Sequence, residues 1–205
     1  MRYASIRKTD VSNGLGIGIS LFVQGCHFHC YNCFNQCTWD FNGGKEWNND
    51  IKEKFLSLLK KDHIQRVSIL GGEPLADENV SDIYSLIYDI RDKYPNKKIW
   101  MFSGYRFDDI MYEGLHIYSD NYEDNSNNKI ISARLYSTLM LDVLVDGLYI
   151  DKLRDMKLKW KGSSNQRVIN IKETYKKYNL RLSEDIKCCP DSVRELINSS
   201  IVELE

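Results

Sequence analysis

The chain has 205 residues and a mass of 24.0 kDa, which suffices for one domain with a substantial hydrophobic core, with or without an appendage. Its 28 basic and 29 acidic residues nearly cancel, to a net charge of -1, so the composition gives no sign of a nucleic-acid or membrane surface. The N-terminus lacks the apolar segment of a signal peptide, and the apolar runs are far shorter than the ~20 residues that cross a bilayer. We therefore expect a cytoplasmic protein without nucleic-acid or membrane partners.

In chain order, predicted strands alternate with predicted helices. Apolar runs predict strands at residues 1–10, 17–23, 66–70, 98–102, 141–145 and 167–171, and helical spacing predicts helices at 50–62, 79–94, 106–112, 130–138 and 192–198. Residues 113–128 are mostly polar and are expected to form a surface loop insertion. We divide the chain into a main domain, residues 1–172, and a charged C-terminal extension, residues 173–205.

This alternation is typical of an α/β fold with mostly parallel strands. Several strands end in a turn of small residues: Gly25-Cys26, Gly71-Gly72, Ser103-Gly104 and Asp146-Gly147. The carboxyl ends of parallel strands share one edge of a sheet, where ligands bind, so these turns are expected to face one cavity. The chain is too short for eight βα units, and we predict a partial, open βα barrel.

Three cysteines follow the second strand at C-x3-C-x2-C spacing: Cys26, Cys30 and Cys33. A fully protein-ligated iron–sulfur cluster takes four thiolates, and a structural zinc site also takes four ligands. Three thiols therefore leave one metal position open for a substrate or cofactor.

A zinc site is the alternative interpretation of the same loop. Cys26, His29, Cys30 and Cys33 form a plausible Cys3His set, and the residues of the loop alone do not separate the two interpretations. The Gly-Gly-Glu-Pro turn and the other strand-end turns favour a cavity with a bound cofactor, because a structural zinc knuckle needs neither.

Several further sequence blocks follow one another along the chain. They are Leu21–Cys26, Cys33–Trp39, Ile69–Leu75, Ile99–Tyr105, Asp142–Gly147 and Trp160–Arg167. With C-x3-C-x2-C followed by an aromatic residue and Gly-Gly-Glu-Pro, this set resembles the radical S-adenosylmethionine (SAM) enzymes. Within them it is most similar to the proteins that activate anaerobic ribonucleoside-triphosphate reductase. The resemblance covers roughly residues 1 to 170.

The resemblance implies a set of cofactor contacts. Cys26, Cys30 and Cys33 would bind three irons of a [4Fe–4S] cluster, and SAM would chelate the fourth iron. Cys37 would then be a small buried thiol and not a ligand, and Cys188 and Cys189 would be incidental. The remaining predicted SAM contacts are Gly71, Gly72 and Glu73 at the methionine end, Phe34 with the backbone of Asn32 and Cys33 at the adenine, and Ser103, Asp146, Ser163, Ser164 and Asn165 at the ribose or carboxylate. Each member of this last group, and Glu73 too, could instead cap its own turn.

The resemblance also implies a reaction and two partners. The chain would generate a 5′-deoxyadenosyl radical from SAM and install a glycyl radical on anaerobic ribonucleoside-triphosphate reductase, with the cofactors supplying the chemistry and no side chain assigned as a general base. A low-potential electron donor such as a flavodoxin or ferredoxin is expected. The alternatives are another small radical SAM enzyme, such as an activase of a different glycyl-radical enzyme or a deazapurine synthase, and a non-catalytic zinc-binding module.

Overall fold

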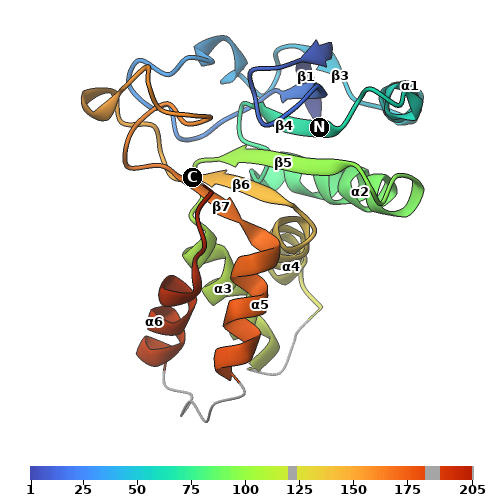
Figure 1. Cartoon of the computed structure of the whole chain (residues 1–205). Helices are drawn as coiled ribbons and strands as arrows, with labels where there is room; N and C mark the ends of the chain where they lie inside the picture. Colours follow the sequence, from blue (N-terminus) through green and yellow to red (C-terminus); the bar gives the residue numbers. More distant parts are fainter. Residues whose placement is uncertain (120–123, 183–189, 205) are drawn as a thin grey trace.

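A seven-stranded mixed sheet forms the centre of the computed structural model, which describes residues 1–119, 124–182 and 190–204 (Figure 1). Its strands are β1 Arg2–Asp10, β2 Gly18–Val23, β3 Lys45–Glu46, β4 Arg66–Gly71, β5 Lys98–Ser103, β6 Val143–Asp146 and β7 Arg167–Asn170. Their order across the sheet is β3-β1-β2-β4-β5-β6-β7. The four middle strands are parallel, whereas β1, β3 and β7 run antiparallel to their neighbours. The predicted α/β class is confirmed, and the sheet is mixed.

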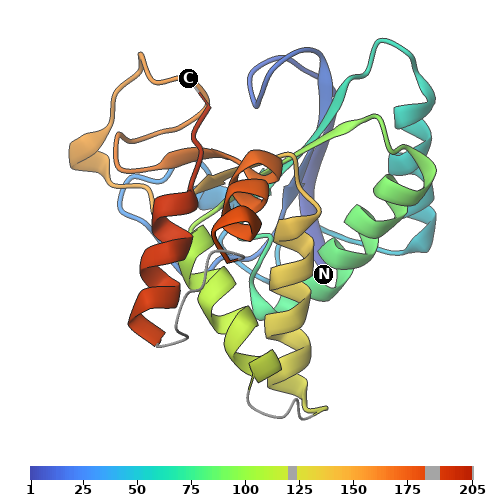
Figure 2. The same ribbon diagram turned by 60° about the horizontal axis from the view of Figure 1, so that its bottom comes forward.

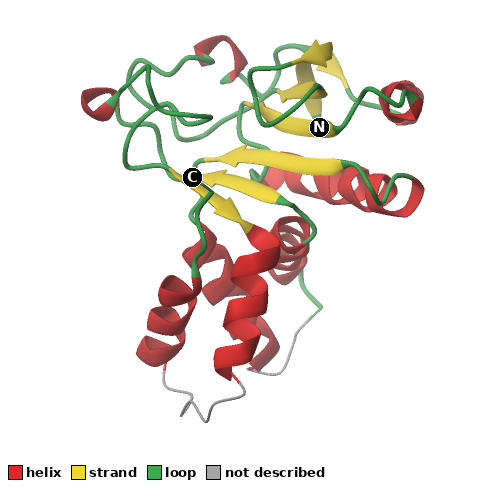
Figure 3. Ribbon diagram, viewed as in Figure 1, coloured by secondary structure: helices red, strands yellow, loops and turns green. Residues whose placement is uncertain are grey.

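The helices lie along the sheet and beyond its β7 end (Figures 1 and 3). They are α1 Asn49–Ser57, α2 Asp77–Lys93, α3 Phe107–Ser119, α4 Ser126–Leu139, α5 Ile171–Leu182 and α6 Pro190–Ser200, with short 3-10 turns η1 Gln36–Thr38, η2 Leu58–Lys60 and η3 Asp151–Leu153. Figure 2 shows α3, α4, α5 and α6 gathered as one group. No helix in the described ranges has the length and apolar character required to cross a membrane.

The prediction of a surface loop at residues 113–128 is wrong for most of this range. Helix α3 continues to Ser119 and α4 already begins at Ser126, while residues 120–123 lie outside the described part of the chain. Helix α3 continues because Leu115 keeps the helical spacing and packs on the core, and Gly114 lies where α3 meets Leu135 of α4. The polar Asn125 starts α4 as its N-cap, with its side chain accepting from the Asn128 amide at 2.8 Å.

Helix α5 was not predicted. Ile171, Thr174 and Tyr178 are buried at helical spacing, but charged residues between them conceal this pattern in the sequence. Helix α6 was predicted near its observed position and packs against α3 and α5, with Leu196 and Ile197 in the main core. After α6 the chain returns to the sheet, where Leu204 donates its amide to the carbonyl oxygen of Val168 at 2.7 Å.

The two faces of the sheet are covered differently. On the helix side, residues such as Ile19, Leu21 and Val23 of β2 join one large core with the helices. On the other side, a small cluster of Trp100, Val143, Val145 and Val168 is covered in part by Phe102, Trp160 and Leu204. This second face is less completely filled, and Phe102 and Trp160 on it line the cavity that contains the candidate site.

Candidate active site

The carboxyl ends of β2, β4, β5 and β6 surround a cavity of about 450 Å³. Its lining includes Cys26, Cys30, Cys33, Phe34, Gly71, Gly72, Glu73, Ser103, Gly104 and Gly147. The loops that follow β2 and β6 lie together above this edge (Figure 1). The structure therefore brings most of the residues selected from the sequence to one place, as the argument from parallel strand ends predicts.

The cysteine loop is fixed at its base by backbone hydrogen bonds. The amides of Gly25 and Cys26 donate to the carbonyl oxygens of Thr38 and Trp39 at 2.7 and 3.0 Å. Gly25 has φ +94, and a Cβ atom there would lie 2.1 Å from Phe41, so only glycine fits. Within the loop, His29 and Asn32 also adopt positive φ, which allows the chain to turn sharply between one thiol and the next.

The three thiols share an environment that suits a cation. Each is free and half-buried. Burial raises the pKa of Cys26 and Cys30, and so does the nearby thiol of Cys30 or Cys33 respectively. Neighbouring half-buried thiols resist ionising together until a metal supplies positive charge, and a coordinating thiol is then deprotonated. In a [4Fe–4S] cluster each thiolate binds a different iron, so the three thiols need not converge on one point. The donor set therefore fits an iron–sulfur cluster.

The two histidines are engaged elsewhere. The His27 ring Nε2 lies 2.9 Å from a carboxylate oxygen of Glu78, and its ring packs on Phe41. The His29 ring stacks on Trp39 with centroids 4.5 Å apart. In the described part of the chain, no three His, Cys, Asp or Glu side chains gather around one ion-sized point. The positions of both rings give no support to His29 as a zinc ligand.

Cys37 differs from the other three cysteines. It is exposed, so the expectation of a buried thiol is wrong, because the 3-10 turn η1 that contains it lies at the surface. Its backbone carbonyl accepts from the Gln24 side chain at 3.3 Å, and its side chain is outside the cavity lining. Cys188 and Cys189 lie outside the described residues.

The Gly71-Gly72-Glu73-Pro74 turn packs directly on the base of the cysteine loop. The amides of Gly72 and Glu73 donate to the carbonyl oxygens of Val23 and Gly25 at 2.9 and 2.7 Å. A Cβ atom at Gly72 would lie 2.3 Å from the Gly25 oxygen. The buried Asn79 side chain, from α2, donates to the carbonyl oxygens of both Gln24 and Glu73. The two motif segments are thus one connected unit.

Glu73 is buried, and its carboxylate joins the turn after β4 to the turn after β5. It accepts from the Leu75 amide, the Ser103 hydroxyl and the Gly104 amide, each at 2.8 Å. Burial raises the pKa of Glu73 to about 7, even though these donors favour the charged form. The carboxylate therefore caps the strand-end turns of β4 and β5 while it also lines the cavity.

Phe34 and Asn32 lie at the mouth of the cavity beside η3. The Phe34 ring packs on Tyr149 with centroids 5.1 Å apart, and the Arg154 guanidinium lies 4.9 Å from its centre. The Asn32 side-chain amide donates to the Asp151 carboxylate at 3.2 Å. The loop after β6 therefore contacts the cysteine loop from the outside.

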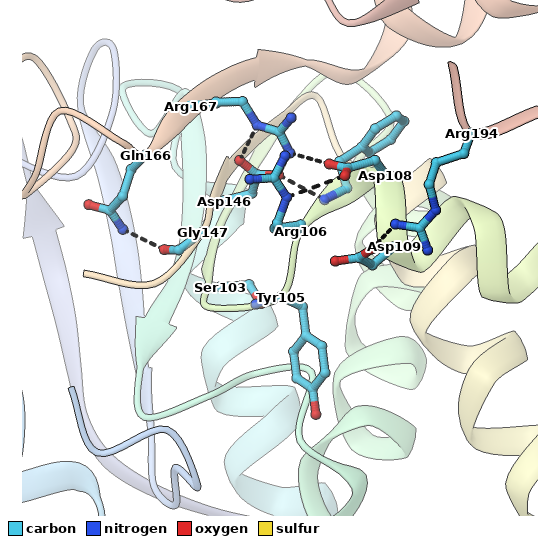
Figure 4. Close-up of polar contacts among 11 residues, drawn as sticks. Ser103, Tyr105, Arg106, Asp108, Asp109, Asp146, Gly147, Gln166, Arg167 and Arg194 are labelled. Atoms are coloured by element: carbon cyan, nitrogen blue, oxygen red, sulfur yellow. Dashed lines mark hydrogen bonds and ion pairs between the residues drawn. The ribbon is translucent and has the colours of Figure 1, made fainter. Parts of the chain in front are cut away.

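Asp146 is buried and holds β7 and α3 in place (Figure 4). Its carboxylate accepts from the Phe107 amide at 2.7 Å and from Arg167 Nε at 2.8 Å. Arg167 also bonds Asp108 at 2.6 Å. These contacts support the alternative in which Asp146 caps its own surroundings, and its side chain is not among the cavity-lining residues.

The turn after Gly162 is likewise held by its own neighbours. The Ser163 hydroxyl accepts from the Ile150 amide at 3.1 Å, and the Asn165 side chain donates to the Leu148 carbonyl at 2.8 Å. Ser164 donates its amide to the Leu153 carbonyl at 2.9 Å. None of the three lines the cavity, so SAM contacts from this turn stay a prediction.

Several cavity residues were missed in the sequence, among them Arg7, Phe28 and Tyr149. Arg7 of β1 reaches the lining and lies 4.7 Å from the Phe22 ring centre, Phe28 packs against Tyr105, and Tyr149 packs on Phe34. Phe28 could have been found because it lies between two of the cysteines. Arg7 is harder to find, because the sequence does not show which residues of β1 face the cavity.

Comparison with known proteins agrees with this geometry. Residues 12–169 match the family described as a 4Fe-4S single cluster domain. The anaerobic ribonucleoside-triphosphate reductase-activating protein of Salmonella typhi is 33% identical over 174 residues, which cover 84% of this chain and all of that protein. The proteins of the same name from Escherichia coli K12 and Enterobacteria phage T4 are 32% identical and cover 84% and 82% of this chain, with 100% and 93% of their own lengths matched.

Proposed function

Because the chain belongs to the family of anaerobic ribonucleoside-triphosphate reductase-activating proteins, with a 4Fe-4S single cluster domain, we propose that it is a radical SAM enzyme that installs a glycyl radical on that reductase. The observation that carries the proposal is the connection between the cysteine loop and the Gly71–Pro74 turn. The three thiols and this turn line one cavity, and the 2.7 Å bond between Glu73 and Gly25 joins them.

In this proposal Cys26, Cys30 and Cys33 would hold the cluster as thiolates, and three protein ligands would leave one iron for SAM. When bound, the cluster and SAM supply the electron transfer and the 5′-deoxyadenosyl radical that removes hydrogen from a glycine of the reductase. The protein binds and orients the cofactors and excludes water from them. The glycines at 71 and 72 bring backbone close to the methionine end, and Phe34, with the backbone of Asn32 and Cys33, offers an apolar face to the adenine. Glu73 and Ser103 line the same space and are assigned to SAM positioning, and Asp146, Ser163 and Asn165 to support of the ribose end.

We assign the fold to the open radical SAM barrel on the same basis. The parallel middle strands and the half-covered sheet face support this assignment. An open barrel suits a protein substrate, because a glycine-bearing segment must enter from outside.

The experiment uses the protein reconstituted with iron and sulfide under anaerobic conditions. We expect a brown protein with about four irons per chain, and a glycyl radical signal in electron paramagnetic resonance after reduction and mixing with SAM and the anaerobic reductase. A Cys30→Ala variant, handled identically, serves as the negative control. A colourless protein that retains zinc would contradict the proposal. A cluster-loaded protein that cleaves SAM but leaves every anaerobic reductase unmodified would indicate a different radical SAM enzyme.

A further inference from the structure

The segment between Leu148 and Lys161 is basic and largely exposed. It holds five basic residues, Lys152, Arg154, Lys157, Lys159 and Lys161, against two acidic ones, Asp151 and Asp155. The chain as a whole has a net charge of -1, so the rest of the molecule is net negative. This concentration of positive charge is therefore local.

The two acidic residues of the segment do not neutralise its lysines. Asp151 accepts from the Tyr149 hydroxyl and the Asn32 amide, and Asp155 accepts from the Lys157 backbone amide at 2.8 Å. Lys152, Lys157 and Lys159 are exposed, and within the described residues no ion pair is recorded for any of them. Their charges are therefore available to a partner.

Apolar side chains stand among these charges. Met156 and Tyr31 are each 78% exposed, and Leu153 is 41% exposed. We call Tyr31, Lys152, Leu153, Met156, Lys157 and Lys159 together the basic rim. Tyr and Met side chains are enriched at protein interfaces, and charges of one sign guide the encounter with a partner of opposite charge.

The basic rim lies directly against the loop that carries the thiols. Asn32, between Cys30 and Cys33, bonds Asp151, and Phe34, next to Cys33, packs on Arg154 and Tyr149. Figure 1 shows the short orange helix η3 beside the blue cysteine loop at the same end of the molecule. A partner on the basic rim is therefore close to the cluster ligands without entering the cavity.

We propose that the basic rim is the docking surface for an acidic one-electron carrier protein, which delivers its electron to the cluster through the Cys30–Phe34 loop. This inference rests on the proposed function, because it requires a cluster that must be reduced. The reduced carrier loses one electron, the cluster gains it, and no bond or proton is transferred. Small, charge-guided interfaces are typical of such electron-transfer encounters. The reductase is the alternative occupant, and the affinities measured below separate it from the carrier.

The test compares K152E/K157E/K159E with a control of equal charge change, K54E/K60E/K61E, on α1 and just after it. All six lysines are exposed. The probes are an acidic flavodoxin and an acidic ferredoxin, and the first readout is their affinity for cluster-free and cluster-loaded protein at low and moderate salt. We expect the rim variant to lose about tenfold or more in affinity and most of the salt dependence, while the control stays within about twofold of the wild type.

Further readouts separate this inference from the proposed function. With dithionite in place of the carrier, SAM cleavage by the rim variant should equal that of the wild type, whereas carrier-driven reduction should be slower by a factor similar to the loss of affinity. If dithionite fails with the wild type, the proposed function fails. If the wild type works but the rim variant binds both carriers normally, this inference alone is overturned. It is also overturned if the rim variant loses affinity for the reductase and keeps it for the carriers.

Discussion

The amide nitrogen of Glu73 lies 2.7 Å from the carbonyl oxygen of Gly25, to which it donates a hydrogen bond. This bond joins the end of β4 to the start of the cysteine loop, which are 48 residues apart in sequence. Gly72 makes the approach possible, because a Cβ atom there would lie 2.3 Å from the same oxygen. The position of the thiols therefore depends on Gly72, although this residue has no side chain to contact them.

Gly72→Ala should separate the turn from the cysteine loop. The added methyl group meets backbone, which cannot rotate away, so we expect a loss of about 1 to 3 kcal/mol in the free energy of unfolding, with a fall in iron content after reconstitution. Urea unfolding and iron analysis measure the two effects. Gly114→Ala is the control, because it adds the same group on α3 against the side chain of Leu135, far from the thiols. Normal iron content in Gly72→Ala would show that the loop does not need this contact.

The ligand count can be tested with single cysteine variants. Cys26→Ser, Cys30→Ser and Cys33→Ser should each lose most of the iron, because a cluster with an open iron has no spare thiolate. Cys37→Ser should keep it, since Cys37 is exposed and outside the cavity lining. The measurement is iron per chain with the charge-transfer absorption of the cluster, and circular dichroism verifies the fold. Loss of the cluster in a folded Cys37→Ser protein would make Cys37 a ligand and leave no iron for SAM.

The cavity could be predicted from local patterns, and its supporting contacts could not. Glycines at strand ends mark turns in the sequence, and the cysteines are recognised by their close spacing. Asp146 also follows a strand, yet β7 runs antiparallel to β6 and places Arg167 directly opposite it, so an ion pair occupies a carboxylate that the sequence assigns to SAM. The exposure of Cys37 and the contact of Arg7 with the cavity likewise depend on how the side chains pack in the folded chain.

The carboxyl group of Glu73 should make stability depend on pH. Burial raises its pKa from 4.5 to about 7, so the folded state binds more protons than the unfolded state between these values. The contribution of Glu73 to the free energy of unfolding is complete below about pH 4.5 and is lost as the pH rises through about 7. The total loss is about 3 kcal/mol, at ~1.4 kcal/mol per pKa unit. Urea unfolding of the cluster-free protein from pH 5 to pH 8 should show this decline. Glu73→Gln should flatten it, and Glu53→Gln, at an exposed position, should not. A wild-type protein as stable at pH 8 as at pH 5 would mean that Glu73 ionises normally.

Asp10 and Arg66 form a buried ion pair beneath the far end of the cavity. The Arg66 Nη2 atom donates to a carboxylate oxygen of Asp10 at 2.9 Å, and the two side chains are 0% and 1% exposed. The same carboxylate caps the following turn by accepting from the amides of Ser12 and Asn13, both of which line the cavity. Burial alone would raise the pKa of Asp10, but the bonds from Arg66 and Asn13 outweigh it and lower the pKa to about 2.

Asp10→Ala should therefore cost about 3 to 5 kcal/mol of unfolding free energy, because it leaves the Arg66 charge buried without a partner. The double variant Asp10→Asn/Arg66→Met removes both charges and should be more stable than Asp10→Ala. Below pH 4 the wild type should lose stability as Asp10 is protonated, and the double variant should lose less, since the contribution of a lowered carboxyl pKa disappears as pH falls towards about 2. Urea unfolding at pH 7 and pH 3 measures both effects. If Asp10→Ala costs less than about 1 kcal/mol at pH 7, water reaches Arg66 in the folded protein, and the turn at Ser12 and Asn13 is held by its backbone alone.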